Sequence, residues 1–309
     1  METFFDRALA AARQLGASDI HLKPGLAPIL RINGELRTLR DVPPLARDFL
    51  HSLAMSLLND RRREALERFG DVTVALTTGA GIRQRVHVSQ QRGGVGMTLR
   101  LIPPEVPALG TLGLPEDVGQ LLEPGPGLVL VAGGPSSGKT TTLAAMIDDL
   151  GTRRPCHVLT IEDPVEVLLK DRRSVVVQRE VGLDVPTTAA GLRAAARMDA
   201  DIVMVGELGD GDAAELALAA AEGGRLVLAG LAGGGSAAAA LERLVGLWDK
   251  DERPAVRERL GRAVRGVVFQ RLVPADKGKR RTASAELLRA EALAAALNTD
   301  AVEPRPAGD

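Results

Sequence analysis

The residues with the clearest chemistry form one glycine-rich segment, Gly133-Gly134-Pro135-Ser136-Ser137-Gly138-Lys139-Thr140. It fits G-x-x-x-x-G-K-[ST], follows an apolar run and opens an apolar helical pattern, which is the context that a P-loop requires. Backbone N–H groups of such a loop close around phosphates, and the helix N-terminus adds positive potential. We therefore expect this segment and Thr141 to bind ATP, with Lys139 at the β and γ phosphates and the Thr140 hydroxyl on Mg²⁺.

Two carboxylates follow apolar runs further along the chain. Residues 202–205 (IVMV) lead into Gly206 and Glu207, an arrangement typical of a Walker B element, in which the acid meets Mg²⁺ and the attacking water. Residues 159–161 lead into Glu162 in the same way. Because neighbouring parallel strands present their carboxyl ends at one edge, we expect Glu207 to be catalytic and to contact the metal, with Glu162 assisting. The alternative for Glu207 is an ordinary surface acid.

The elements that must position these groups alternate between strand and helix. Apolar runs and helical patterns follow one another at residues 128–132, 140–150, 158–161, 189–198, 202–205, 212–222 and 226–229. That rhythm predicts an α/β core at residues 116–275, with a parallel sheet covered by helices.

The first part of the chain has a different pattern. Residues 1–102 mix a helical start with short alternating runs, which predicts a smaller α+β domain, and Asn33-Gly34 between two such runs indicates a hairpin. Four prolines punctuate residues 103–115, the composition of an inter-domain linker. Residues 276–309 are expected to form a short C-terminal helical tail.

Composition narrows the class of protein. The 309 residues carry 39 basic and 40 acidic side chains, a net charge of -1, and only 2% aromatics, so neither electrostatic attraction nor base stacking favours nucleic acid as a partner. The only cysteine, Cys156, cannot form an internal disulfide and fits a reducing compartment. No run approaches 18 apolar residues. We expect a soluble cytoplasmic protein, free or peripheral at the inner face of the plasma membrane.

Several segments resemble the type II and type IV secretion ATPases in the correct order from about residue 16 to 275. Residues 159–166 (LTIEDPVE) resemble their Asp box, residues 178–182 (QREVG) a shared segment, and residues 192–202 (LRAAARMDADI) their Walker B approach. Residues 16–22 (GASDIHL) and 30–35 (LRINGE) resemble the N-terminal PAS-like domain of the type IV pilus retraction (PilT-like) subfamily, and residues 269–272 (FQRL) the end of its core.

This resemblance implies a RecA-like P-loop core that follows an N-terminal PAS-like domain in the sequence. It also implies assembly as a hexameric ring, with ATP between the two domains. It implies that Arg83, Arg85 and Arg100 contact nucleotide phosphates, for which guanidinium forks are suited. Arginines that alternate on a strand are otherwise a solvated face. The resemblance also implies an inner-membrane pilus platform protein as a partner.

The sequence departs from the family at polar positions. In the stretch that resembles the His box, residues 223–233 (GGRLVLAGLAG), Arg225 and Ala232 stand where histidines are expected, and Gly209 replaces an arginine after Glu207. Alanine and glycine side chains donate no hydrogen bond, so only Arg225 could partly compensate. Residues 291–298 (EALAAALN) also lack the arginines of the subfamily's C-terminal motif. We expect firm ATP binding but slow hydrolysis.

Two hypotheses follow. The first is a hexameric ATPase that powers pilus retraction and twitching motility. The second is a catalytically weak paralogue that binds ATP and acts as a regulatory or assembly subunit of a pilus or secretion machine, joining rings of a related ATPase. A nucleic-acid translocase on the same core is disfavoured by the neutral charge and scarce aromatics.

Overall fold

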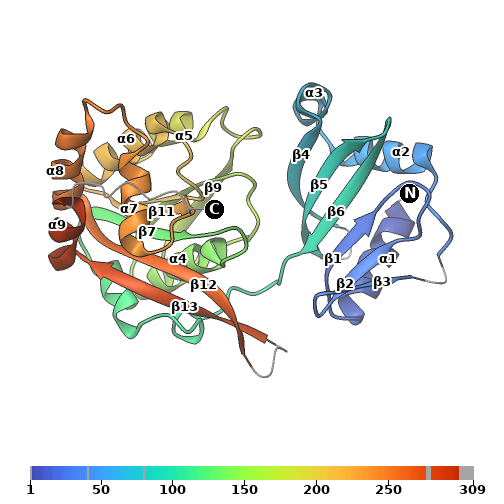
Figure 1. The fold of residues 1–309 in the computed structure, drawn as a ribbon, viewed down its shortest axis with the longest axis horizontal. Coiled ribbons are helices and arrows are strands. Elements are labelled where there is room, and N and C mark those ends of the chain that lie inside the picture. Colours follow the sequence, from blue (N-terminus) through green and yellow to red (C-terminus); the bar gives the residue numbers. More distant parts are fainter. Residues whose placement is uncertain (1, 40–41, 79–80, 276–279, 299–309) are drawn as a thin grey trace, which may run out of the picture. The chain divides into compact units, whose positions relative to one another are not determined.

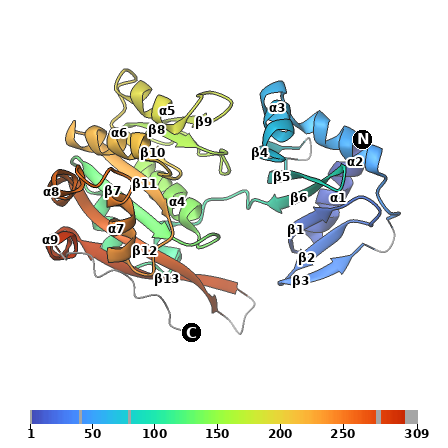
Figure 2. The same cartoon turned by 45° about the horizontal axis from the view of Figure 1, so that its top comes forward.

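The structure, a computed structural model, describes residues 2–39, 42–78, 81–275 and 280–298. Contacts divide the chain into two units, drawn in Figures 1 and 2. The first unit holds Met1–Glu105 with Pro164–Leu168, and the second holds Val106–Asp163 with Leu169–Asp309.

The first unit is an antiparallel sheet with helices, as its alternating pattern predicts. Its strands lie in the order β3-β2-β1-β6-β5-β4, and every neighbouring pair is antiparallel. The elements are α1 (Glu2–Gln14), β1 (Ala17–Leu22), β2 (Ile29–Ile32), β3 (Glu35–Thr38), α2 (Arg47–Leu57), α3 (Asp60–Phe69), β4 (Asp71–Thr77), β5 (Arg83–Gln91) and β6 (Gly94–Leu101).

The predicted hairpin is confirmed. Ile32 pairs with Glu35, which leaves Asn33 and Gly34 as the two turn residues. Both have positive φ, 50° and 88°, as a two-residue turn of the primed type requires.

The second unit is the expected α/β fold. Its sheet has the order β13-β12-β7-β11-β10-β8-β9, and only β13 runs antiparallel to its neighbour. The elements are η1 (Leu109–Thr111), η2 (Glu116–Leu122), β7 (Gly127–Gly133), α4 (Lys139–Arg153), β8 (His157–Glu162), β9 (Val175–Glu180), α5 (Thr188–Ala195), β10 (Ile202–Val205), α6 (Gly211–Glu222), β11 (Leu226–Ala232), α7 (Ala237–Val245), α8 (Arg253–Ala263), β12 (Val264–Ala275), β13 (Arg280–Arg289) and α9 (Ala290–Asn298).

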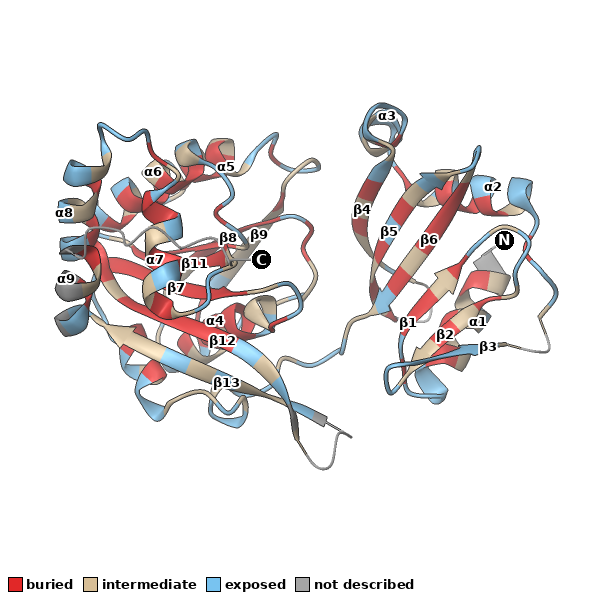
Figure 3. Cartoon of the chain, viewed as in Figure 1, coloured by how far each residue is buried: buried red, intermediate tan, exposed pale blue. Residues whose placement is uncertain are grey.

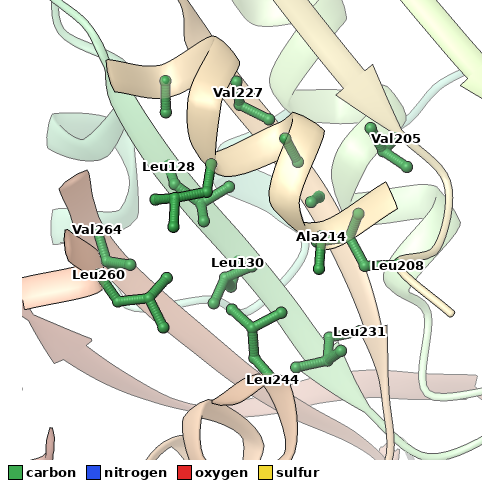
Figure 4. Close-up of a cluster of buried hydrophobic side chains, with 14 of the residues drawn as sticks. Leu128, Leu130, Val205, Leu208, Ala214, Val227, Leu231, Leu244, Leu260 and Val264 are labelled. Carbon is green, nitrogen blue, oxygen red and sulfur yellow. The ribbon is translucent and has the colours of Figure 1, made fainter. Parts of the chain in front are cut away.

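Both faces of this sheet are buried, so its central strands are apolar throughout (Figure 3). Along β7, Leu128 and Leu130 belong to one hydrophobic cluster, while Val129 and Val131 belong to another on the opposite face. The first cluster includes side chains of α6, α7 and α8, and Figure 4 shows part of it. The second includes the apolar side of α4.

Local capping explains where several helices of this unit begin. The side chains of Thr187, Asp210 and Ser236 accept hydrogen bonds from backbone N–H groups in the first turns of α5, α6 and α7, at 3.1, 2.8 and 3.1 Å. Such caps satisfy donors that an isolated helix end leaves unpaired.

The end of the chain differs from the expected helical tail. β13 pairs with β12 along its whole length, from Gly266 opposite Arg289 to Ala275 opposite Arg280. α9 is a helix, as expected, but Leu293 and Leu297 are buried in the main cluster of the core. These residues therefore extend the core unit, because the β12–β13 pairing supplies a long-range partner that local composition does not reveal. Residues 299–309 of the expected tail lie outside the described residues.

No helix of the described ranges has the length and apolar character needed to cross a membrane.

Charged side chains connect helix α8 to α6, and their hydrogen bonds lead to a first prediction. The Arg259 guanidinium donates to Glu215 and Glu222, and its hydrogen bond to Glu215 holds the pKa of the Glu215 carboxyl below its ordinary value of 4.5. We expect Arg259→Gln to lower the stability of the core unit by about 1 kcal/mol near pH 7, because the pairs are partly exposed. A depressed carboxyl pKa contributes stability above pH 4.5 that is lost on acidification, so the deficit shrinks at lower pH.

Thermal midpoints at neutral and acidic pH measure this effect. Arg262→Gln is the control, because Arg262 pairs with Glu258 on the same helix and both side chains are largely exposed, at 73% and 68%. Equal shifts for the two variants, or a deficit that does not change with pH, would contradict the prediction.

Candidate functional site

The P-loop joins β7 to α4 in the geometry that phosphate binding needs. β7 ends at the buried Gly133, and Lys139 opens α4 directly after Gly138, whose φ is 93°. Ser136 also has positive φ, 58°, an uncommon conformation for a residue with a side chain. Nζ of Lys139 donates to the carbonyl oxygens of Gly133 and Gly134, at 3.0 and 3.2 Å. The lysine is thus folded back over the loop that would hold the phosphates.

Gln270 on β12 holds this loop through side-chain hydrogen bonds. Its side chain is 1% exposed, accepts a hydrogen bond from the Thr142 hydroxyl at 2.9 Å and donates to the Ser137 carbonyl at 2.7 Å. A Cβ at Gly133 would lie 2.4 Å from the Gln270 carbonyl oxygen, so the loop and β12 are in close contact. In the sequence, Gln270 stands out only as part of residues 269–272, which resemble the end of the family's core. A polar residue in an apolar strand was the available signal for its role.

The loop fits the phosphates of a nucleotide. Backbone N–H groups of a glycine-rich loop before a helix can close around phosphates. The Ser137 hydroxyl is buried without a hydrogen-bond partner among the described residues. Thr140 lies in the first turn of α4 and is half-buried, and the next residue, Thr141, is exposed. The Thr140 hydroxyl has the chemistry and position of a P-loop Mg²⁺ ligand.

The two predicted acids lie at the same edge of the sheet as the P-loop. Glu162 is the last residue of β8, and Glu207 follows β10, which pairs in parallel with β8. β10 is two strands from β7, a separation of about 10 Å at ordinary strand spacing. Glu207 is exposed, whereas Glu162 is 5% exposed. The structure therefore brings together the loop and both acids.

Each acid is held differently. Oε1 of Glu162 accepts hydrogen bonds from the Thr160 hydroxyl at 2.6 Å and from Nε2 of Gln178 at 3.1 Å. Glu207 is placed by its backbone neighbours, since Leu208 N–H donates to the Gly230 carbonyl at 2.8 Å. The fixed Glu162 is suited to orienting neighbouring groups, and the exposed Glu207 is free to meet water.

The structure shows where the three positions that depart from the family pattern lie in the core unit. Ala232 ends β11 opposite Gly133, beside the P-loop, and Gly209 is exposed in the turn after Glu207. Arg225, however, immediately precedes β11, at the amino edge of the sheet. β11 pairs with β7 over seven residues, which separates Arg225 from the P-loop edge by about 20 Å. The expectation that Arg225 compensates at the phosphates is therefore wrong for the site in its own chain.

The three predicted arginines gather on one sheet of the first unit. Arg83 and Arg85 alternate on β5, and Arg100 on β6 lies directly opposite Arg85. Arg100 forms an ion pair with the buried Asp19 at 2.9 Å, and Arg85 forms one with Glu166. Nε of Arg83 donates to the Glu166 carbonyl at 3.2 Å. A contact of these arginines with nucleotide stays a prediction.

Comparison with known proteins identifies the relatives of this chain. A model of the type II/IV secretion system protein family matches residues 1–303. The type IV pilus retraction ATPase PilT of Pseudomonas aeruginosa is 36% identical over 294 residues, 95% of this chain and 85% of that protein. The uncharacterized protein YggR of Escherichia coli is 39% identical over 283 residues, 92% of this chain and 85% of that protein.

A solved structure agrees with these matches. The crystal structure of the pilus retraction motor PilT with bound ADP superposes with a TM-score of 0.83 at 39% identity, covering 94% of this chain and 85% of that one.

Proposed function

The chain belongs to the type II/IV secretion system protein family, and on that premise we propose that it is an ATP-hydrolysing motor for type IV pilus retraction and twitching motility. One observation carries the proposal. The P-loop with Lys139 and the acids Glu207 and Glu162 converge on one edge of the core sheet. That edge has the donors to hold a triphosphate and the carboxylates to direct water at it.

The cofactors of this proposal are ATP and Mg²⁺. Residues 133–141 hold the phosphates, with Lys139 leaving its loop carbonyls to reach the β and γ groups. The Thr140 hydroxyl and Glu207 would hold the metal, which neutralises charge on the phosphates when bound. The crystal structure of PilT contains ADP, which supports nucleotide as the ligand of this fold. Arg83, Arg85 and Arg100 are proposed to add guanidinium contacts to the phosphates.

Glu207 has the central part in the hydrolysis that we propose. As an exposed carboxylate beside the P-loop edge, it accepts a hydrogen bond from the attacking water and orients it toward the γ phosphate. Glu162, held by Thr160 and Gln178, keeps the neighbouring strand end polar and fixed. Gln270 holds the loop in position through Ser137 and Thr142.

Turnover is proposed to be slow. Gly209 and Ala232 lie at this edge and supply no side-chain donor to the developing charge. The same observation favours a second candidate function, that of a weakly active subunit that binds ATP and assembles with, or regulates, a more active relative. We place the protein in the cytoplasm as a hexamer that works on an inner-membrane pilus platform protein.

Glu207→Gln separates these functions. We expect the variant to retain ATP affinity and to lose hydrolysis by about 10²-fold or more, because positioning of the attacking water by a carboxylate contributes at least that much. Steady-state phosphate release and nucleotide titration on the purified full chain measure the two properties. Glu252→Gln, at an exposed acid before α8, is the matched control and should behave like the parent.

Two outcomes would change the proposal. Hydrolysis by the parent that equals that of Glu207→Gln, with ATP binding retained, would leave only the regulatory function. Absence of nucleotide binding at millimolar ATP would exclude both.

A further inference from the structure

A polar cavity lies at the amino edge of the core sheet, away from the P-loop. Its volume is about 360 Å³, within the range of cavities that hold small molecules. Arg154, Cys156 and Asp201 line it together with Gly224 and Arg225. Leu226, another lining residue, pairs with Gly127, whereas the P-loop begins six residues further along these strands. The two sites are therefore about 20 Å apart along β11.

Two guanidinium groups in this cavity carry buried nitrogens that lack an acceptor. Nε of Arg154 and Nε of Arg225 are shielded from solvent and have no hydrogen-bond partner among the described residues. A buried donor without an acceptor costs free energy. An oxyanion in the cavity would supply the missing acceptor, and guanidinium groups are suited to phosphate oxygens.

A third arginine strengthens the positive potential here. Arg265 donates to the carbonyl oxygens of Glu123 and Gly125, at 2.8 and 3.3 Å, and Gly125 also lines the cavity. Burial, and after it the nearby charge of Arg154, lower the pKa of Arg265. Like charges held this close are stabilised by an anion between or beside them.

The acidic groups of the cavity and its margin neutralise only part of this charge. Asp201 is exposed, and its carboxylate accepts the backbone N–H of His157 at 2.8 Å. Burial raises the pKa of the Cys156 thiol, although the charge of Arg154 and a hydrogen bond with its side chain act in the opposite direction, so the thiol stays neutral near pH 7. The charge of the Glu123 carboxylate also acts on Arg265, so the cavity and its margin hold three guanidinium groups against two carboxylates.

The wall beside Arg225 admits a ligand. Gly223 and Gly224 are exposed, and Gly224, with φ of 101°, has no neighbouring atom within 4 Å of the position of a Cβ. From this cavity and its arginines we propose a second anion site, in which Arg154 and Arg225 bind the phosphate group of a small ligand independently of the P-loop.

Titration with inorganic phosphate and with pyrophosphate tests this proposal. The full chain is first saturated with a non-hydrolysable ATP analogue, so that the P-loop is filled up to the γ position, and heats of binding are then recorded. The analogue's own titration tests the P-loop separately, so failure of either site is recognised by itself. We expect saturable phosphate binding in the filled protein.

Matched variants locate the site. Arg225→Gln should weaken phosphate binding at least about tenfold, because it removes a charge-assisted contact. Arg154→Gln should do the same, so that a folding defect in one variant does not decide the matter. Arg281→Gln removes an exposed charge on β13 and should leave the affinity unchanged.

Three outcomes would overturn the proposal. These are no saturable binding at millimolar phosphate or pyrophosphate, equal affinities in Arg225→Gln and Arg281→Gln, and a change of oligomeric state in Arg225→Gln without a change in phosphate affinity. The last result would assign the arginines to a carboxylate of a second copy of the chain. A preference between phosphate and pyrophosphate would identify whether a single group or a phosphate chain fills the cavity.

Discussion

Lys139→Ala is expected to weaken ATP binding by about 100-fold and to abolish measurable hydrolysis. The substitution removes a cation that would make charge-assisted hydrogen bonds to two phosphates, which together contribute about 3 kcal/mol to binding. Among the described residues, Nζ of Lys139 donates to two loop carbonyls, at 3.0 and 3.2 Å. Loss of those bonds should change stability little, since they are partly exposed to water.

Nucleotide titration and phosphate release measure this effect, and thermal unfolding checks the fold. Lys170→Ala is the matched control, because Lys170 is exposed and lies in the same unit outside the P-loop. Lys139→Ala with unchanged ATP affinity would show that the P-loop does not hold the phosphates, and the proposed function would fail with it.

Gly230→Ala is expected to destabilise the core unit by about 2–4 kcal/mol and to reduce hydrolysis more than ATP affinity. A Cβ at Gly230 would lie 2.0 Å from the Gly206 carbonyl oxygen and 3.1 Å from its carbon. The clash is with backbone, so β11 and the turn that carries Glu207 must move apart. The P-loop follows β7, which lies on the other side of β11 from β10, and it is also held by Gln270 on β12. It should therefore be less affected.

Gly235→Ala is the control for this prediction. Gly235 lies in the glycine-rich segment after β11, and a Cβ there meets no atom within 4 Å. Thermal midpoints, nucleotide titration and phosphate release are compared for both variants. A Gly230→Ala protein with the parent's midpoint and turnover would contradict the close approach of β10 and β11 as the device that positions Glu207.

The P-loop illustrates what local sequence can predict. Gly133, Gly138 and Lys139 are recognisable because phosphate binding demands specific residue types over eight consecutive positions, with a strand before them and a helix after them. The strand ends at Glu162 and Glu207 were predicted for a similar reason, since apolar runs that end in an acid mark the edge of a parallel sheet. Short-range patterns therefore predicted the α/β core and one edge of it.

Long-range pairing decided the rest. The segment that contains β13 turns basic and then rich in Ala and Leu, which predicts a helical tail, and only its pairing with β12 makes it a strand. Gln270 is separated by 128 residues from Thr142, so its hold on the P-loop cannot be derived from spacing. Arg225 is linked to the phosphates only by its place in the stretch that resembles the His box. β11, a strand of seven residues, holds Arg225 about 20 Å from the P-loop edge.

The sequence by itself determined the P-loop between a strand and a helix, the two acids at strand ends and the order of the core elements, because each depends on neighbours close in the chain. The tertiary structure alone decided which strands lie side by side, and hence that Gln270 supports the loop and that Gly230 and Gly206 are in contact. It also decided that Arg154 and Arg225 share a cavity, although 71 positions separate them in the sequence. These residues are far apart along the chain and come together only because the strands of the core sheet pair side by side.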